Sequence, residues 1–123
     1  MLKFKSKDFN NLDEFFPFYL SQHRNNVNRL LHIIGTLLAN LILFISFLYK
    51  NYKFIALVPL VGYVFAWTGH IFFEKNKPTA FGYAKYSFLS DYRMMYEVLS
   101  GNIINIFKEY EIENIDYFKT DLK

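Results

Sequence analysis

Three histidines and one glutamate are the residues of this chain that could do chemistry together. His23 and His32 lie nine residues apart, and His70 and Glu74 lie four apart in a later segment. Residues four apart share one face of a helix, so His70 and Glu74 are expected to point to the same side. Three imidazoles beside a carboxylate can hold a divalent ion with positions left open. The sequence therefore predicts a metal site of His23, His32 and His70, with Glu74 as a further catalytic residue.

Each of these residues also has a purely structural interpretation. A single histidine near the end of an apolar helix is more often a hydrogen-bonded group than a metal ligand. Glu74 has an equal claim to an ion pair with a cation such as Arg29 or Lys75. Asp91 is expected to pair with Arg93 for the same reason. An inert polar network therefore stays open as the alternative to a metal site.

Two uncharged apolar runs must position the histidines. They extend from Leu30 to Tyr49 and from Phe54 to Phe73, and only four residues join them. An α-helix rises about 1.5 Å per residue, so each run of about 20 residues can cross a bilayer core of roughly 30 Å. An antiparallel arrangement brings His32 and His70 to the same depth at one end. The sequence predicts a membrane hairpin with both imidazoles near one membrane face.

A soluble helical bundle is the competing interpretation. A bundle helix shows a polar stripe at helical spacing. The first run carries no charge, and its polar side chains are His32, Asn40 and three hydroxyls. The length and charge criteria for spans therefore favour an all-α integral membrane protein, a two-span hairpin with additional interfacial or re-entrant helices. The 123 residues leave room for one domain, residues 1–123.

The charge pattern predicts an orientation and argues against a nucleic-acid function. The formal net charge is +3, and most basic residues lie before the first apolar run or after the second. By the positive-inside rule both termini face the cytoplasm. The basic residues are too scattered for a nucleic-acid site. The chain has no cysteine, so any metal must be held by histidine, carboxylate or amide oxygen.

A helix before the hairpin is expected to carry the first histidine. It extends from Leu12 to His23, begins at a cap formed by Asn11 and is rich in aromatic residues. Residues 25–26, both asparagine, predict a turn after it. The turn matters because nine residues of unbroken helix would rotate His32 about 180° away from His23. A break there lets both rings face one point.

Further helices are expected after the hairpin. Pro78 should end the second long helix, and residues 80–82 should form a loop. A helix from Lys85 to Leu99 follows, with Gly101 closing it, and we expect it to lie in the membrane interface or to be re-entrant. Its expected apolar face consists of Phe88, Tyr92, Met95 and Leu99. Residues 102–110 predict another short helix before a polar tail.

Two spaced motifs carry a resemblance to a known family. The first is His-x-x-x-x-Asn-x-x-x-His, formed by His23, Asn28 and His32, and the second is Gly-His-x-x-x-Glu, from Gly69 to Glu74. Together they resemble the small membrane-protein family that includes the fungal 2-hydroxy fatty acid dioxygenase. The resemblance covers roughly Phe15 to Gly101.

The resemblance implies an iron(II)-dependent α-oxidation, in which O2 shortens a 2-hydroxy fatty acid by one carbon. Histidines are taken to bind the iron in that family, and the matching residues here are His23, His32 and His70. It also implies residence in the endoplasmic reticulum for a eukaryotic member or in the inner membrane for a bacterial one. The implied partners are the lipid bilayer, a 2-hydroxy fatty acid and O2, with a homo-oligomer left open.

Two departures from the family pattern bear on the site. Asn26 stands where the family usually has proline, and Arg24 stands where some members carry an additional histidine. Because the chain has only three histidines, a four-histidine site is impossible in one copy. Glu74, a water or a partner copy would have to supply any further ligand.

Polar residues near the histidines are candidates for binding the substrate. Arg24, Arg29 or Lys75 could steady a carboxylate. Asn28 is a further candidate, which could instead cap the first long helix or orient a histidine ring. A membrane hairpin that binds lipid or metal without catalysis stays open as the alternative function.

Overall fold

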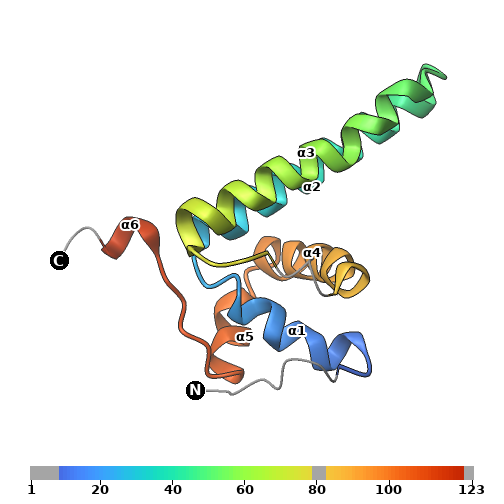
Figure 1. The fold of residues 1–123 in the computed structure, drawn as a ribbon. Helices are drawn as coiled ribbons and strands as arrows, with labels where there is room; N and C mark the ends of the chain where they lie inside the picture. The colour runs from blue at the N-terminus through green and yellow to red at the C-terminus, as the bar shows by residue number, and fades with distance from the viewer. Residues whose placement is uncertain (1–8, 79–82, 121–123) are drawn as a thin grey trace.

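The computed structural model describes residues 9–78 and 83–120, and the regular structure within these ranges is helical (Figure 1). In chain order the elements are α1 (Leu12–Ser21), α2 (Asn26–Leu48), η1 (Tyr52–Ala56), α3 (Leu57–Thr68), η2 (Gly69–Glu74), α4 (Ala84–Leu99), α5 (Ile103–Glu109) and α6 (Tyr117–Thr120). One isolated parallel bridge joins Asn25 to Ile115. The all-α fold class predicted from the sequence is confirmed.

The predicted hairpin is the longest feature of the molecule. Helix α2 packs along a second rod, in which the 3-10 turn η1, the helix α3 and the π-helical turn η2 follow one another without a gap (Figure 1). The connection between the rods is short, and Lys50 within it has a φ of 54°. Gly35 permits the close packing, because a Cβ there would lie 2.7 Å from Cβ of Phe65.

Both rods have the length and composition of membrane spans. Asn26–Leu48 and Tyr52–Glu74 contain stretches of mean hydropathy 2.2 and 1.7, of which only 22% and 11% are buried. The core helix of a soluble protein would be mostly covered by the rest of its own chain. Here large apolar side chains face outward, such as Phe44 at 63% exposed and Leu48 at 61%.

A small helical cap covers one end of the hairpin. Helices α1, α4 and α5 pack together beside the end at which α2 begins (Figure 1). The α1 helix starts as predicted, with the Asn11 side chain accepting a hydrogen bond from the Glu14 backbone N–H. The core of the cap consists of Phe15, Phe16, Tyr19, Leu20, Met94, Ile103 and Phe107. Its burial supplies the hydrophobic stabilisation that holds α1, α4 and α5 together.

Helix α4 forms where the sequence predicts it, and it packs against the rest of the protein with a face other than the expected apolar one. Gly101, with a φ of 79°, follows the helix as expected. However, the buried residues of α4 are Ser87, Ser90 and Met94. Two members of the predicted apolar face, Phe88 and Leu99, are 60% and 69% exposed. Met94 is the residue of α4 that enters the core of the cap.

The two segments that flank the cap also differ from expectation. The second rod ends at Glu74 rather than at Pro78, because Lys75 adopts a left-handed conformation with a φ of 61°. The loop expected at residues 80–82 lies outside the described residues. The polar tail is anchored, since the N–H of Ile115 donates to Arg24 O at 2.8 Å and Ile115 O accepts from the N–H of Asn26 at 3.0 Å.

Candidate metal centre

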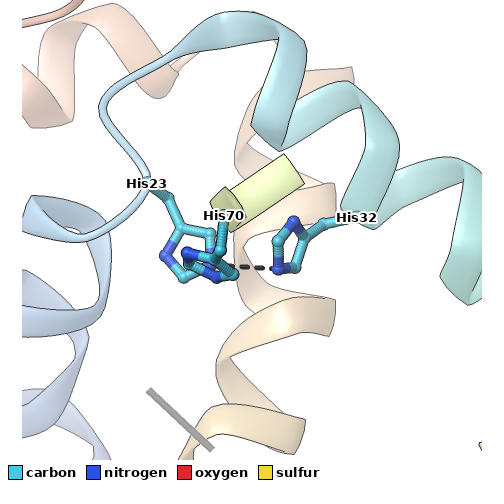
Figure 2. A group of neighbouring side chains, drawn as sticks. All are labelled: His23, His32 and His70. Atoms are coloured by element: carbon cyan, nitrogen blue, oxygen red, sulfur yellow. Dashed lines mark hydrogen bonds between the residues drawn. The ribbon is translucent and has the colours of Figure 1, made fainter. Parts of the chain in front are cut away.

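The three histidines converge at the junction of the cap and the hairpin (Figure 2). His23 comes from the loop after α1, His32 from the second turn of α2 and His70 from η2. Their exposed fractions are 0%, 6% and 1%. One ring nitrogen from each lies within 4.8 Å of the corresponding nitrogens of the other two. The predicted convergence is therefore present in the structure.

Each imidazole is held in place through its Nδ1 atom. Nδ1 of His23 lies 2.6 Å from Tyr19 O, and Nδ1 of His32 lies 2.9 Å from Asn28 O. Nδ1 of His70 lies 2.6 Å from Oδ1 of Asn76, whose own amide nitrogen donates to Gln22 O. These partners are acceptors, so each Nδ1 carries the hydrogen and each Nε2 keeps its lone pair.

The resulting arrangement places lone pairs against one another. Nε2 of His23 and Nε2 of His32 are 3.2 Å apart, and the His70 ring lies 4.6 Å and 4.9 Å from theirs between centroids. Burial, followed by the neighbouring rings of His32 and His70, holds the pKa of His23 well below its usual range. A proton shared between the Nε2 atoms of His23 and His32 is therefore disfavoured. A divalent cation suits three neutral imidazoles, and three protein ligands leave coordination positions open.

The local backbone around His70 contributes to this geometry. The turn Gly69–Glu74 is π-helical, with i→i+5 hydrogen bonding, and π-bulges in α-helices occur frequently at functional sites. Asn76 N donates to His70 O at 3.0 Å and closes the turn. Gly69 is required here because a Cβ would lie 1.9 Å from Oδ1 of Asn28. The close contact of the two rods thus sets the position of His70.

A cavity of about 330 Å³ extends from the histidines between α2, α3 and α4. The three histidines line one end of it, together with Asp91 of α4. The other end is lined by apolar side chains of the hairpin, among them Leu43 and Val58. The candidate metal centre therefore opens into a largely apolar space.

A family model described as 2-hydroxy-palmitic acid dioxygenase Mpo1-like matches residues 9–103. The chain belongs to the Mpo1-like family. Searches of the curated proteins and of the solved structures found no match. The family match contains the three histidines and the cavity lining, but the segment with Asn114 and Ile115 lies beyond it.

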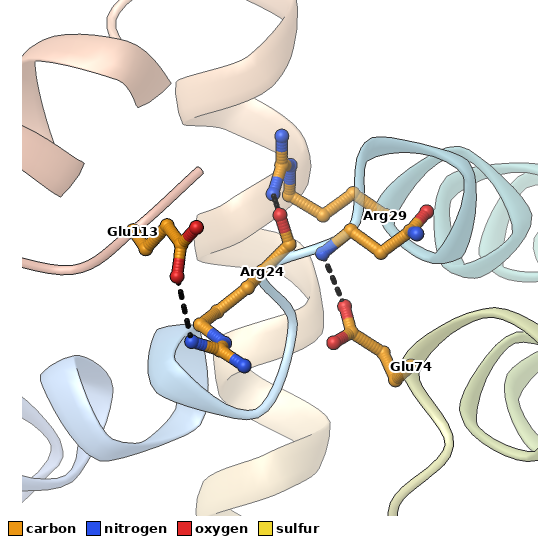
Figure 3. Close-up of polar contacts among 5 residues, drawn as sticks. Arg24, Arg29, Glu74 and Glu113 are labelled. Atoms are coloured by element: carbon orange, nitrogen blue, oxygen red, sulfur yellow. Dashed lines mark hydrogen bonds and ion pairs between the residues drawn. The ribbon is translucent and has the colours of Figure 1, made fainter. Parts of the chain in front are cut away.

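The structure places Glu74 near the Mpo1-like motif histidines but outside their group. Its carboxylate accepts a hydrogen bond from the backbone N–H of Asn25 (Figure 3). The three histidines form the candidate ligand group, and Glu74 is absent from it among the described residues. Glu74 therefore ties the end of the second rod to the loop that carries His23. The helical spacing suggested a shared face, but the π-turn changes the direction of the later side chain.

Arg29 is buried beneath the same loop. One guanidinium nitrogen donates to His23 O and to Arg24 O, both at 2.8 Å, and the other donates to Asn114 Oδ1 at 2.6 Å. The guanidinium also lies 4.7 Å from the centre of the Phe107 ring. All of these contacts are internal, so Arg29 holds the backbone at His23 and Arg24.

The remaining predicted substrate residues lie in different surroundings. Arg24 forms a surface ion pair with Glu113 at 3.4 Å (Figure 3). Lys75 is exposed, and Asn28 is buried against Gly69. Among the described residues, the cavity lining includes none of Arg24, Arg29, Asn28 or Lys75.

Two residues of the site were missed at the level of sequence. Asp91 accepts a hydrogen bond from the Tyr19 hydroxyl, and the Tyr19 ring stacks on His23 with centroids 3.9 Å apart. The expected pair of Asp91 with Arg93 is wrong, because Arg93 pairs with Asp13 at 2.9 Å. Burial raises the pKa of Asp91 to about 7. The sequence held a signal for Tyr19, because a spacing of four residues places it on the same helix face as His23. It held no such signal for Asp91.

Proposed function

We propose that this protein is a membrane-embedded, iron(II)-dependent dioxygenase that converts 2-hydroxy fatty acids to acids one carbon shorter. The observation that carries the proposal is the convergence of three imidazole nitrogens in a member of a family named for 2-hydroxy-palmitic acid dioxygenase. His23, His32 and His70 would hold the iron. The overall reaction balances, since the 2-hydroxy acid and one O2 give the shortened acid, one CO2 and one water.

Iron is the metal whose chemistry the reaction requires. When bound, iron(II) supplies the redox chemistry that lets O2 react with a carbon substrate, which zinc cannot supply. The protein's part is to fix the ring nitrogens, to exclude water and to orient the substrate. The Nδ1 partners of the three histidines support the first of these roles, because outer hydrogen bonds orient ligand rings and raise their basicity.

The hairpin would place this centre at the cytoplasmic face of a membrane. Its outward apolar side chains need a nonpolar environment. Most basic residues lie before the first rod or after the second, which favours cytoplasmic termini. A fatty acid dissolved in the bilayer could then reach the cavity without crossing water. The membrane would be the inner membrane in a bacterium and the endoplasmic reticulum in a eukaryote.

In this proposal the polar residues at the junction of the cap and the hairpin hold the loop that carries His23. Arg29 fixes the backbone carbonyls of His23 and Arg24. Glu74 fixes the N–H of Asn25, and Asn28 fixes the contact with η2. Arg24 and Lys75 lie nearer the surface and remain the candidates for attracting the substrate carboxylate. An arginine is well suited to that role because its fork matches a carboxylate.

The test uses purified protein in lipid nanodiscs, stripped of metal and reloaded without oxygen. With iron(II), O2 and a long-chain 2-hydroxy acid, mass spectrometry should detect the acid one carbon shorter. The same protein loaded with zinc should give none. The His70→Ala protein should lose both tight iron binding and turnover while still inserting into membranes. Iron binding without turnover of any 2-hydroxy acid would leave a metal-binding hairpin and would reject the dioxygenase.

A further inference from the structure

The cavity is a slot that follows the hairpin away from the histidines. On α2 its lining residues recur every three or four positions, at His32, Thr36, Ala39 and Leu43. The second rod shows the same recurrence, at His70, Ala66, Gly62 and Val58. Residues at this spacing form one face of a helix. The slot is therefore bounded by one face of each rod, with α4 on the remaining side.

The far end of the slot lies deep in the hairpin. His32 and Leu43 are eleven residues apart on α2, which corresponds to a rise of roughly 16 Å. Ser46, one turn beyond Leu43, is fully buried and is not part of the lining. The slot thus extends from the buried histidines to an apolar end, where its lining stops at Leu43 and Val58.

The lining suits an unbranched alkyl chain. Small residues, Ala39, Gly62 and Ala66, leave the space along the hairpin walls. The polar pair in the middle of the slot is internally satisfied, because the Asn40 amide and the Tyr92 hydroxyl hydrogen-bond to each other at 2.9 Å. An alkyl chain lying there would leave no hydrogen bond of this pair unmade.

We propose that the slot holds the alkyl chain of the substrate and that Leu43 and Val58 set the longest chain that fits. This inference rests on the proposed function, since the 2-hydroxy acid head must lie at the histidines for the tail to enter the slot. Ala39 lies partway along and limits how much of the chain can pass. Chains longer than the slot must bend or remain partly in lipid, so the extra carbons add no binding affinity.

The test compares two substitutions of opposite direction on one helix. Ala39→Leu fills the slot and should shift the preferred chain to a shorter one. Leu43→Ala lengthens it and should shift the preference to a longer one. Leu41→Ala is the matched control, because Leu41 is 52% exposed and lies off the slot, and it should leave the preference unchanged. Each methylene excluded from the slot should weaken binding about fourfold.

Binding and turnover are measured separately over a homologous series of saturated 2-hydroxy acids. Binding is followed without O2, by displacement of a fluorescent fatty acid from the iron-loaded protein, and iron binding itself reports that each variant is folded. Turnover with an unchanged chain preference in both slot variants would overturn the slot and leave the dioxygenase standing. Shifted binding preferences without turnover in any protein would support the slot and reject the dioxygenase. A Leu41→Ala shift equal to that of Leu43→Ala would also overturn the slot.

Discussion

The two halves of the hairpin are made from the same helices and have opposite surroundings. In the half near the cap, Asn28, Arg29 and His32 of α2 are buried. In the far half, Phe44 and Phe47 of the same helix are 63% and 58% exposed. Polar residues are thus covered by protein, and apolar residues face outward. This distribution is the reverse of that in a soluble helical pair.

The comparison shows why the candidate metal centre is confined to one half. Polar groups removed from water must find partners, and near the cap they find them in the loops and in the C-terminal segment. Arg29, for example, is satisfied by two loop carbonyls and by Asn114. Among the residues that the structure describes, the far half has no such neighbours, and its Ser46 hydroxyl bonds to Ile42 O of its own helix. Substitutions that disturb contacts near the cap should therefore affect the metal centre, whereas matched changes elsewhere should not.

The largest expected effect comes from the glycines of the second rod. A Cβ at Gly69 would lie 1.9 Å from Oδ1 and 3.3 Å from Cα of Asn28, whereas a Cβ at Gly62 meets nothing within 4 Å. Gly69→Ala should push η2 away from α2, and with it the His70 ring. We expect metal affinity to fall by at least the tenfold typical of a lost outer contact.

The matched protein for this comparison is Gly62→Ala, which should keep its affinity for metal. Titration of each metal-stripped protein with cobalt(II), followed by visible absorption, measures the metal affinities of the two variants. Equal affinities in the two variants would show that the contact between the rods does not position His70.

A smaller effect is expected from the arginines beside His23. Arg29→Ala leaves the buried carbonyl of His23 without a donor, whereas Arg24 O keeps the N–H of Ile115. The loss should lower the free energy of unfolding by about 2 kcal/mol. Arg24→Ala breaks a surface ion pair and should cost less than about 1 kcal/mol. Denaturant unfolding in detergent gives both values. Similar losses in the two proteins would contradict the assignment of Arg29 as the residue that holds the loop.

The sequence predicted the hairpin and the meeting of the histidines because both follow from regular helix geometry. The apolar lengths of the two rods and the equal distances of His32 and His70 from the connection are arithmetic on a 1.5 Å rise. The break at Asn25 could also be read, since its side chain caps α2 by accepting from the Val27 N–H. These features need no knowledge of distant contacts.

The features that were missed depend on contacts between segments far apart in the chain. Tyr19 and Asp91 are separated by 72 positions, and the Asn114 contact to Arg29 spans 85. No local pattern specifies such pairs. The face with which α4 packs was not predicted for a related reason, because hydrophobicity alone cannot show that Ser87 and Ser90 are buried. The π-turn at His70 likewise depends on how η2 meets Asn28.

The smallest expected effect is a pH dependence contributed by Asp91. Its pKa is raised by burial from 3.8 to about 7, so the unfolded chain loses this proton at lower pH than the folded protein. Stability from this residue is therefore present below about pH 4 and is lost as the pH rises towards 7. Asp91→Asn removes the free-energy cost of ionising a buried carboxyl group. Its side-chain oxygen can still accept from the Tyr19 hydroxyl. In metal-stripped protein the variant should melt near wild type at pH 4 and a few degrees above it at pH 8. The histidines titrate in both proteins, so the difference between the two melting curves isolates Asp91. A difference that is constant with pH would mean that Asp91 ionises normally and is not buried beside the metal centre.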